Sequence, residues 1–214
     1  MQVIRKYSSI IMVIVIFREI ALPYYMGFFS DRTQVYLLSD LGQPRLAISH
    51  SFDVWEIIDG ILFILAAQFI YEWGKKYSAK IGIFLTCLVI MYGIGDCIMT
   101  ALFVYSGSAF SNWHSLIHST GSVIGCGALY LANFIIIKLL YDEDMFKLAY
   151  TFLVTQVISI FVSIMLELPI SVSALISGIL QCVALDLMYI PMLILSIITL
   201  SKGFNYCADN KKGD

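Results

Sequence analysis

Charged side chains are scarce in this sequence. Asp, Glu, Lys and Arg together make up 13% of the 214 residues, whereas about a quarter is typical of soluble globular domains. Hydrophobic residues make up 60% of the chain, and its mean hydropathy is +0.87. So few charges cannot cover a water-exposed surface. The composition therefore excludes an ordinary water-soluble enzyme and indicates a polytopic membrane protein.

The chain also lacks an excess of positive charge and a paired cysteine motif. Its 13 Lys and Arg against 15 Asp and Glu give a net charge of −2. Phosphate binding requires a basic field, so this balance argues against a nucleic-acid partner. The five cysteines form no Cys-x-x-Cys pair, and four of them fall inside apolar runs. Such cysteines are usually small buried hydrophobic residues.

Long apolar runs are abundant. Crossing about 30 Å of hydrocarbon takes roughly 20 mostly apolar residues in an α-helix, and six segments are long enough. We therefore predict an all-α fold, a single domain of six transmembrane helices over residues 1–202, with a polar cytoplasmic tail at 203–214. The six segments are about 8–29, 50–71, 79–105, 114–138, 146–167 and 177–200.

The distribution of Lys and Arg predicts the orientation of these helices. Cytoplasmic connections of membrane proteins carry more Lys and Arg than outer ones. Ten basic residues lie in the terminal segments and the even-numbered connections, while only Arg32 and Arg45 lie in the odd-numbered ones. We therefore predict a multi-pass protein of the cell membrane, embedded in the lipid bilayer, with both termini in the cytoplasm.

Four ionisable residues are predicted near the middle of the bilayer. Ionisable side chains in hydrocarbon are costly and by default mark function. With a rise of about 1.5 Å per residue, Arg18, Asp59, Asp96 and Asp186 each lie about 14 Å deep. Three acids and one arginine require protons, a cation or water for charge balance. Either one ion pair only holds the bundle together, or the layer is functional; both alternatives remain open.

Arg18 needs an anionic partner at this depth, because arginine stays charged in proteins. The candidates are Asp59, Asp96 and Asp186. Gly93 and Gly95 lie three residues and one residue before Asp96 and should let a neighbouring helix approach closely. We therefore expect Arg18 to pair with Asp96.

All three histidines lie near the predicted outer ends of helices. His114 and His118 share one helix face at a spacing that can place two imidazoles on one metal ion. His50 begins the second span at the same level. If the three converge, they predict a Zn²⁺ site with a bound water, where Asp53 or Glu56 acts as general base or orients a ligand. The alternative is that they are ordinary interfacial residues, which is the more frequent case at helix ends.

A short motif, Ser39-Asp40-Leu41-Gly42, precedes the second span. Here the chain resembles an uncharacterised bacterial six-helix membrane family, domain of unknown function 998, whose first outer loop carries a Ser-x-Leu-Gly signature (Ser39, Leu41 and Gly42). The resemblance covers about residues 35–200 and implies a six-helix fold but no activity. Gln181-Cys182 departs from the family, which usually has an arginine there. Other matching positions are Gly60, Gly93, Gly95, and His114 or His118.

Three functions are consistent with these features. The first is a small-molecule or cation/proton-coupled binding or transport protein that uses the midplane layer. The second is a zinc-dependent intramembrane hydrolase of a lipid-like amide or ester, because the histidines are similar in number and spacing to those of seven-helix membrane hydrolases of the alkaline ceramidase and adiponectin-receptor type. The third is a non-catalytic immunity or accessory protein.

Overall fold

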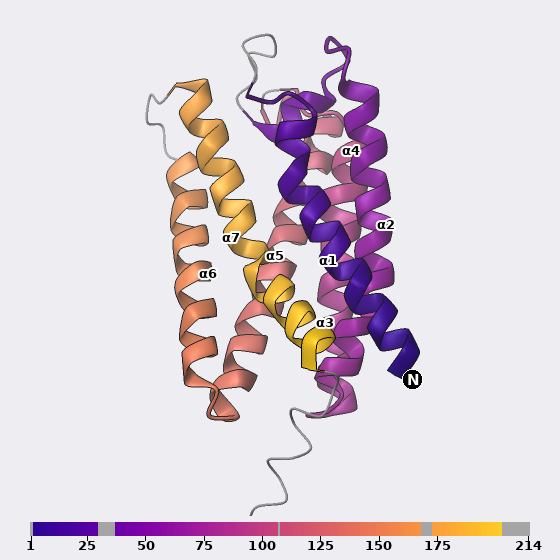
Figure 1. The fold of residues 1–214 in the computed structure, drawn as a ribbon. Coiled ribbons are helices and arrows are strands. Elements are labelled where there is room, and N and C mark those ends of the chain that lie inside the picture. The colour runs from indigo at the N-terminus through magenta and orange to yellow at the C-terminus, as the bar shows by residue number, and fades with distance from the viewer. Residues whose placement is uncertain (1, 30–36, 107, 168–172, 203–214) are drawn as a thin grey trace, which may run out of the picture.

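Helices form nearly all of the computed structural model, which describes residues 2–29, 37–106, 108–167 and 173–202 (Figure 1). The described residues contain no strand and form six helical spans long and apolar enough to cross a membrane, which confirms the predicted fold class. The predicted tail at 203–214 and Arg32 lie outside these residues. The helices are α1 (Gln2–Tyr25), η1 (Leu38–Gly42), α2 (Ser49–Gly74), α3 (Ala79–Tyr92), η2 (Gly93–Met99), α4 (Thr100–Leu102), α5 (Trp113–Asp142), α6 (Phe146–Glu167) and α7 (Ala174–Lys202).

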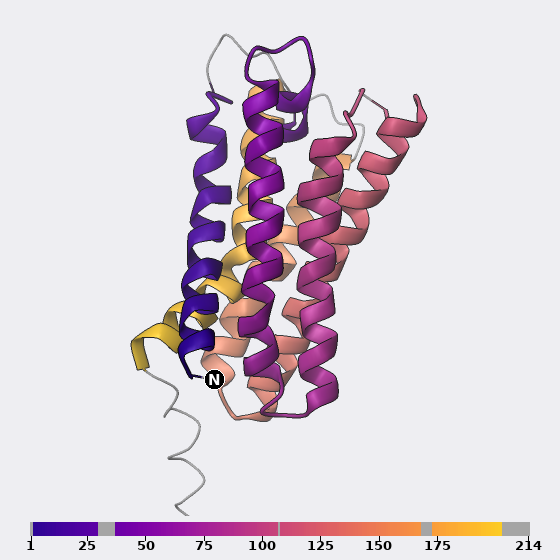
Figure 2. The ribbon, with the colours of Figure 1, turned by 90° about the vertical axis from the view of Figure 1, so that its right-hand side faces the viewer.

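The six spans form a closed ring. Neighbours along the chain pack together, with α3, η2 and α4 joined into the third span, and α7 packs against α1 to close the ring. The start of α1 and the end of α7 lie at the same end of the bundle (Figures 1 and 2). This arrangement agrees with an even number of crossings. That this end faces the cytoplasm remains a prediction.

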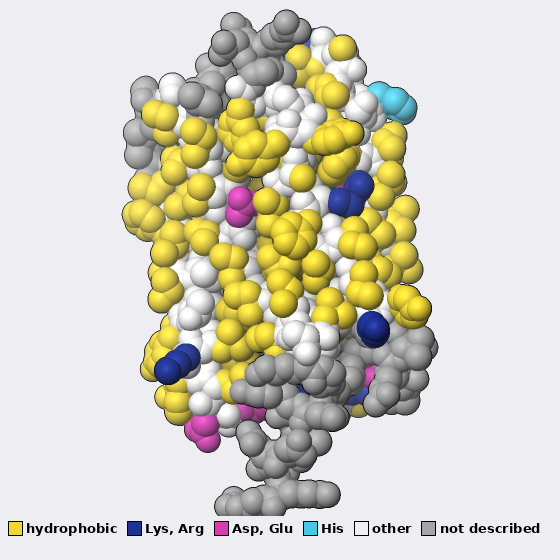
Figure 3. Space-filling view, in the orientation of Figure 1, with side chains coloured by type: hydrophobic (Ala, Val, Ile, Leu, Met, Phe, Trp, Pro, Cys, Tyr) yellow, Lys and Arg dark blue, Asp and Glu magenta, His cyan; other side chains and the backbone are white. Residues whose placement is uncertain are grey.

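The surface of the bundle is apolar and its interior holds polar groups. Hydrophobic side chains cover most of the height of the face shown in Figure 3. Large apolar residues such as Phe17, Val123 and Phe161 are 55–73% exposed. By contrast, Asp59 and Asn133 are fully buried. This distribution suits a protein whose outer surface contacts lipid.

Glycines bring the third span into backbone contact with two neighbours. A Cβ atom on Gly60 of α2 would lie 2.6 Å from the carbonyl oxygen of Gly93, and one on Gly95 would lie 2.6 Å from that of Gly121 on α5. Both contacts are too short for any side chain. The segment that makes them, η2, is a π-helix, a wider turn that occurs frequently at functional sites.

Pro191 interrupts the hydrogen bonding of α7, because proline has no N–H for the carbonyl of Leu187. Two buried amides on other helices bind this stretch of backbone. Gln156 Nε2 of α6 donates to the Leu187 carbonyl at 3.0 Å, and Asn133 Nδ2 of α5 donates to the neighbouring carbonyl of Met188 at 2.8 Å. The interior thus supplies the hydrogen bonds that lipid cannot.

Candidate functional site

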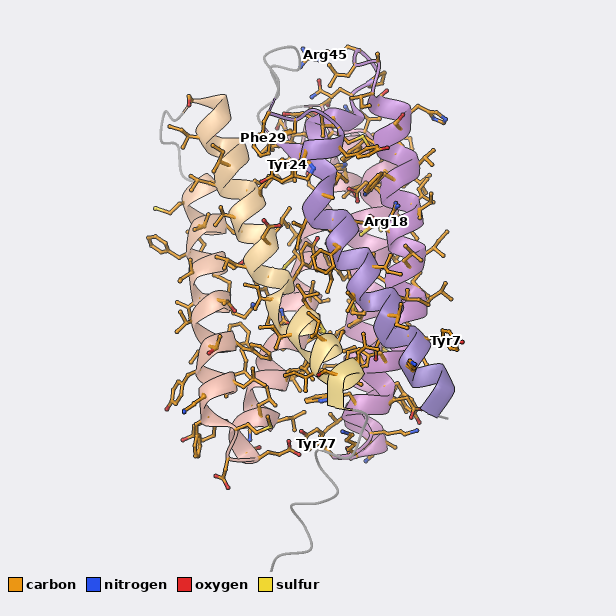
Figure 4. All side chains as sticks on the ribbon, viewed as in Figure 1. Tyr7, Arg18, Tyr24, Phe29, Arg45 and Tyr77 are labelled. Carbon is orange, nitrogen blue, oxygen red and sulfur yellow. The ribbon has the colours of Figure 1, made fainter. Side chains whose placement is uncertain are left out.

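An ion pair joins α1 and α2 inside the bundle. Arg18 Nε donates a hydrogen bond to Asp59 Oδ1, and the guanidinium also stacks on Trp55, 4.1 Å from the ring centroid. The Arg18 side chain is 27% exposed, whereas Asp59 is fully buried. Figure 4 shows Arg18 on α1 between the levels of Tyr7 and Tyr24. An arginine at this depth therefore has an anion and an aromatic face as partners.

The prediction that Asp96 pairs with Arg18 is wrong. Asp96 Oδ1 instead accepts a hydrogen bond from Ser122 Oγ of α5 at 2.5 Å. The glycines beside Asp96 do permit close helix approach, but the helices that approach are α2 and α5, while α1 packs against α2 and α7. Asp59 lies on α2 and is therefore the carboxylate within reach. Asp186 lies half-buried on α7, near Cys182 of the same helix.

A second set of buried groups lies beside the ion pair. The ligand atoms of Glu19 (α1), Glu56 (α2) and Cys97 (η2) all lie within 4.8 Å of one another. We call these three residues, together with Asp59, the central cluster. Glu56 is 8% exposed and Cys97 1% exposed. Three helices therefore contribute acidic or thiol groups to one small buried volume.

Two oxygen atoms of the central cluster receive no hydrogen bond from a donor group. They are Glu19 Oε1 and Asp59 Oδ2, and the carboxyl groups of Glu19 and Asp59 lie close enough to share a proton in a hydrogen bond. The other oxygen of Glu19, Oε2, accepts from the hydroxyl of Tyr189 at 3.4 Å, and that hydroxyl is hydrogen-bonded to Tyr92. Without a proton or a cation between these two carboxyl groups, their acceptor capacity stays unused, which is costly in a buried position.

The charges around Glu19 do not balance if every acid is ionised. Glu56, Asp59 and Asp96 all lie close enough to Glu19 to interact with it electrostatically. Arg18 supplies one positive charge against these four carboxyl groups. Unpaired charge is expensive to bury. The arrangement can therefore bind protons or a cation.

The Ser39–Gly42 motif packs over one end of three helices. Leu41 is fully buried in an apolar cluster with side chains of α1, α2 and α7, and the backbone N–H of Leu38 donates to Gln181 Oε1 at 2.7 Å. A Cβ on Gly42 would lie 3.1 Å from Asp53 Oδ1, so glycine lets the segment sit directly on α2. The motif is a structural element that packs over one end of the bundle.

The sequence comparison agrees with this architecture. Residues 23–198 match the model of a family described as Protein of unknown function (DUF998). The chain belongs to the DUF998 family. No curated protein and no solved structure matches it. Membership confirms the resemblance carried by the motif, and with the six spans it supports a multi-pass membrane protein.

The predicted three-histidine site does not form in this DUF998 chain. Among the described residues, the group of metal-ligand side chains that comes together contains no histidine. His118 is buried, and its Nδ1 lies 2.7 Å from the carbonyl oxygen of Phe103, so the ring ties α5 to the end of the third span. His114 is exposed and its ring lies against that of Trp113, with 3.8 Å between ring centroids and 41° between ring planes. His50 is exposed at the start of α2.

The two acids assigned to that site differ in their surroundings, since Asp53 lies close enough to His50 of the same helix to interact with it electrostatically. Asp53 is partly buried beside Gly42, and Glu56 belongs to the central cluster. Sequence reasoning missed Glu19 and Cys97 as members of that cluster. Glu19 had a usable signal, because it directly follows Arg18 and lies at nearly the same depth. Cys97 had none, since a cysteine in an apolar run is normally a small hydrophobic residue.

Proposed function

We propose that this DUF998 protein binds a cation, either a proton or a metal ion, in the central cluster and couples that binding to the recognition or transport of a small-molecule or lipid-like ligand. The observation that carries the proposal is the excess of buried carboxyl groups. Glu19, Glu56 and Asp59 lie around a single arginine, and two of their oxygens receive no hydrogen bond from a donor group.

A purely structural role explains only part of this arrangement. One arginine and one aspartate are enough to link α1 to α2. Glu19 and Glu56 add two buried carboxyl groups, whose negative charge, if both ionise, the ion pair does not neutralise. Because each unpaired buried charge destabilises the fold, their presence favours a cluster that captures positive charge from outside.

The helices around the cluster contain two irregular segments that favour a coupled movement. The π-helix η2 carries Cys97, and Pro191 lies two residues after Tyr189, whose hydroxyl contacts Glu19. Helices adjust most readily at π-bulges and prolines. We infer that filling or emptying the cluster changes the local geometry of η2 and α7.

Thermal unfolding of the purified protein in detergent tests this proposal. The unfolding temperature is measured while the pH is lowered, or while Na⁺, K⁺, Mg²⁺, Mn²⁺ or Zn²⁺ is added. Lower pH or at least one cation should stabilise the wild type, because positive charge relieves repulsion among the carboxylates. The double variant Glu19→Gln/Glu56→Gln should lose this response, and Asp186→Asn, outside the cluster, should keep the response to added metal ions. Equal responses in the wild type and the double variant would refute the proposal.

The orientation is part of the proposal. We propose that the protein lies in the cell membrane with the ends of the chain in the cytoplasm, because the excess of Lys and Arg lies on the connections at that end. The zinc-hydrolase alternative is not retained, since its three histidines do not meet. If neither protons nor cations stabilise the wild type in the unfolding experiment, the result supports an accessory role without ligand binding.

A further inference from the structure

We infer that Glu19, Glu56 and Cys97 form a binding site for one divalent metal ion of the Zn²⁺ class. The inference rests on the proposed function, because it names the cation that the central cluster takes. The three groups come from α1, α2 and η2, which are distant in sequence. Their ligand atoms nevertheless lie within 4.8 Å of one another.

These separations are close to those of a bound metal ion. With Zn–S bonds of about 2.3 Å and Zn–O bonds of about 2.1 Å, tetrahedral ligands lie roughly 3.4–3.6 Å apart. Each separation in the cluster therefore needs to shorten by little more than about 1 Å to fit that geometry. Rotation of the flexible glutamate side chains can supply a movement of this size.

The donor atoms select the class of metal. Mg²⁺ and Ca²⁺ prefer oxygen ligands alone, whereas Cu⁺ prefers sulfur. One thiolate with two carboxylates suits a borderline ion such as Zn²⁺ or Co²⁺. These three ligands carry three negative charges when deprotonated, so a divalent ion removes most of the charge imbalance.

A further observation points to a ligand at this place. Asp59 is fully buried, its Oδ2 atom receives no hydrogen bond from a fixed donor, and its carboxyl group lies against Glu19 and Trp55; a cation or a proton has to hold the carboxyl groups of Asp59 and Glu19 together. Its other oxygen is held by Arg18. Asp59 is not one of the three residues whose ligand atoms lie within 4.8 Å of one another, but it lies next to Glu19 and adds negative charge beside the site.

Consecutive residues of a helix point in different directions, and Cys97 rather than its neighbour faces α2: a Cβ on Gly60 would lie 3.1 Å from the Cβ of Cys97. Asp96 accepts a hydrogen bond from Ser122 of α5, whereas the Cys97 thiol lies beside Glu19 of α1 and Glu56 of α2. Consecutive residues of η2 therefore serve different neighbours. The close contact of Gly93 with α2 brings this part of η2 near Glu56.

Titration of purified, chelator-treated protein with Co²⁺ tests the site. A Co²⁺–thiolate bond produces a charge-transfer absorption band, which we expect at one ion per chain. The band should disappear in Cys97→Ser and fall sharply in Glu56→Gln. It should persist in the matched control Cys182→Ser, because Cys182 is also buried but lies in the apolar cluster under η1. If Cys97→Ser does not fold, Cys97→Ala takes its place, with gel filtration as the check.

The outcomes separate this inference from the proposed function. No band in the wild type, or a band that survives the loss of Cys97, would overturn the metal–thiolate site. If cations or protons still stabilise the protein through Glu19 and Glu56 in that case, the proposed function stands without it. If the Gln double variant also responds like the wild type, both fail. Competition by Zn²⁺ for the Co²⁺ band is the positive result for the stated class.

Discussion

Arg18→Leu should destabilise the bundle sharply, because it leaves Asp59 as an unpaired carboxylate in a fully buried position. Breaking a buried ion pair by removing one partner costs about 3–5 kcal/mol. Arg18 itself is 27% exposed, so most of the lost stability comes from Asp59, which stays buried without its partner. For a domain of this size, that loss corresponds to a fall of about 6–20 °C in the unfolding temperature.

The double variants make the test specific. Arg18→Leu/Asp59→Asn removes both charges of the pair and should recover much of the lost stability. Arg18→Leu/Asp96→Asn should recover little, because Asp96 is bound to Ser122 rather than to the arginine. Recovery is expected to be incomplete, since the stacking of Arg18 on Trp55 is also lost.

The assay is thermal unfolding in detergent, followed by circular dichroism on variants that elute as a single species in gel filtration. Two results would refute the reasoning. If Arg18→Leu alone is harmless, the arginine is not the compensating charge for Asp59. If Asp96→Asn rescues it and Asp59→Asn does not, the two helices pack with a different rotation from the one described.

Three further predictions concern packing and topology. Gly60→Ala should lower the free energy of unfolding by about 1–3 kcal/mol through overpacking, because the new Cβ would lie 2.6 Å from a carbonyl oxygen of the third span. The matched control in the same unfolding measurement is Gly127→Ala, whose new Cβ would meet nothing within 4 Å. Gln156→Leu should lower the free energy of unfolding by about 1–3 kcal/mol, because it leaves the Leu187 carbonyl of α7 without a hydrogen bond. Adding Pro191→Ala should offset part of that loss, because alanine restores the backbone N–H that donates to this carbonyl. Equal losses with and without the proline would contradict this account. A reporter inserted near Ser108 should locate to the outer side and one at the carboxy terminus to the cytoplasm, and the reverse labelling would contradict the orientation.

The spans could be predicted from the sequence because their cause is local. A helix satisfies its own backbone hydrogen bonds, so an apolar run of sufficient length is enough to define a membrane crossing. All six predicted segments correspond to helices in the described parts of the chain. Arg18 and Asp59 were likewise recognised from their depth alone, since a charge in hydrocarbon stands out in any sequence.

Partner choice depended on the tertiary structure. Which carboxylate meets Arg18 is decided by which helices are neighbours and how each is rotated, and an apolar helix carries little pattern to show either. The glycines beside Asp96 indicated a close approach but not the helix that makes it. For the same reason the sequence left open whether the three histidines converge, and the structure shows that they do not.

The central cluster illustrates what the sequence determines and what only the tertiary structure determines. The sequence by itself determined that costly polar residues lie at similar depths in several spans, because depth follows from counting residues along a helix. Only the packing of the six-membered ring decided that Glu19, Glu56 and Cys97 share one volume while Asp186 does not join them. The depth of a residue depends only on its own helix, whereas the formation of this site depends on how three neighbouring helices are rotated about their axes.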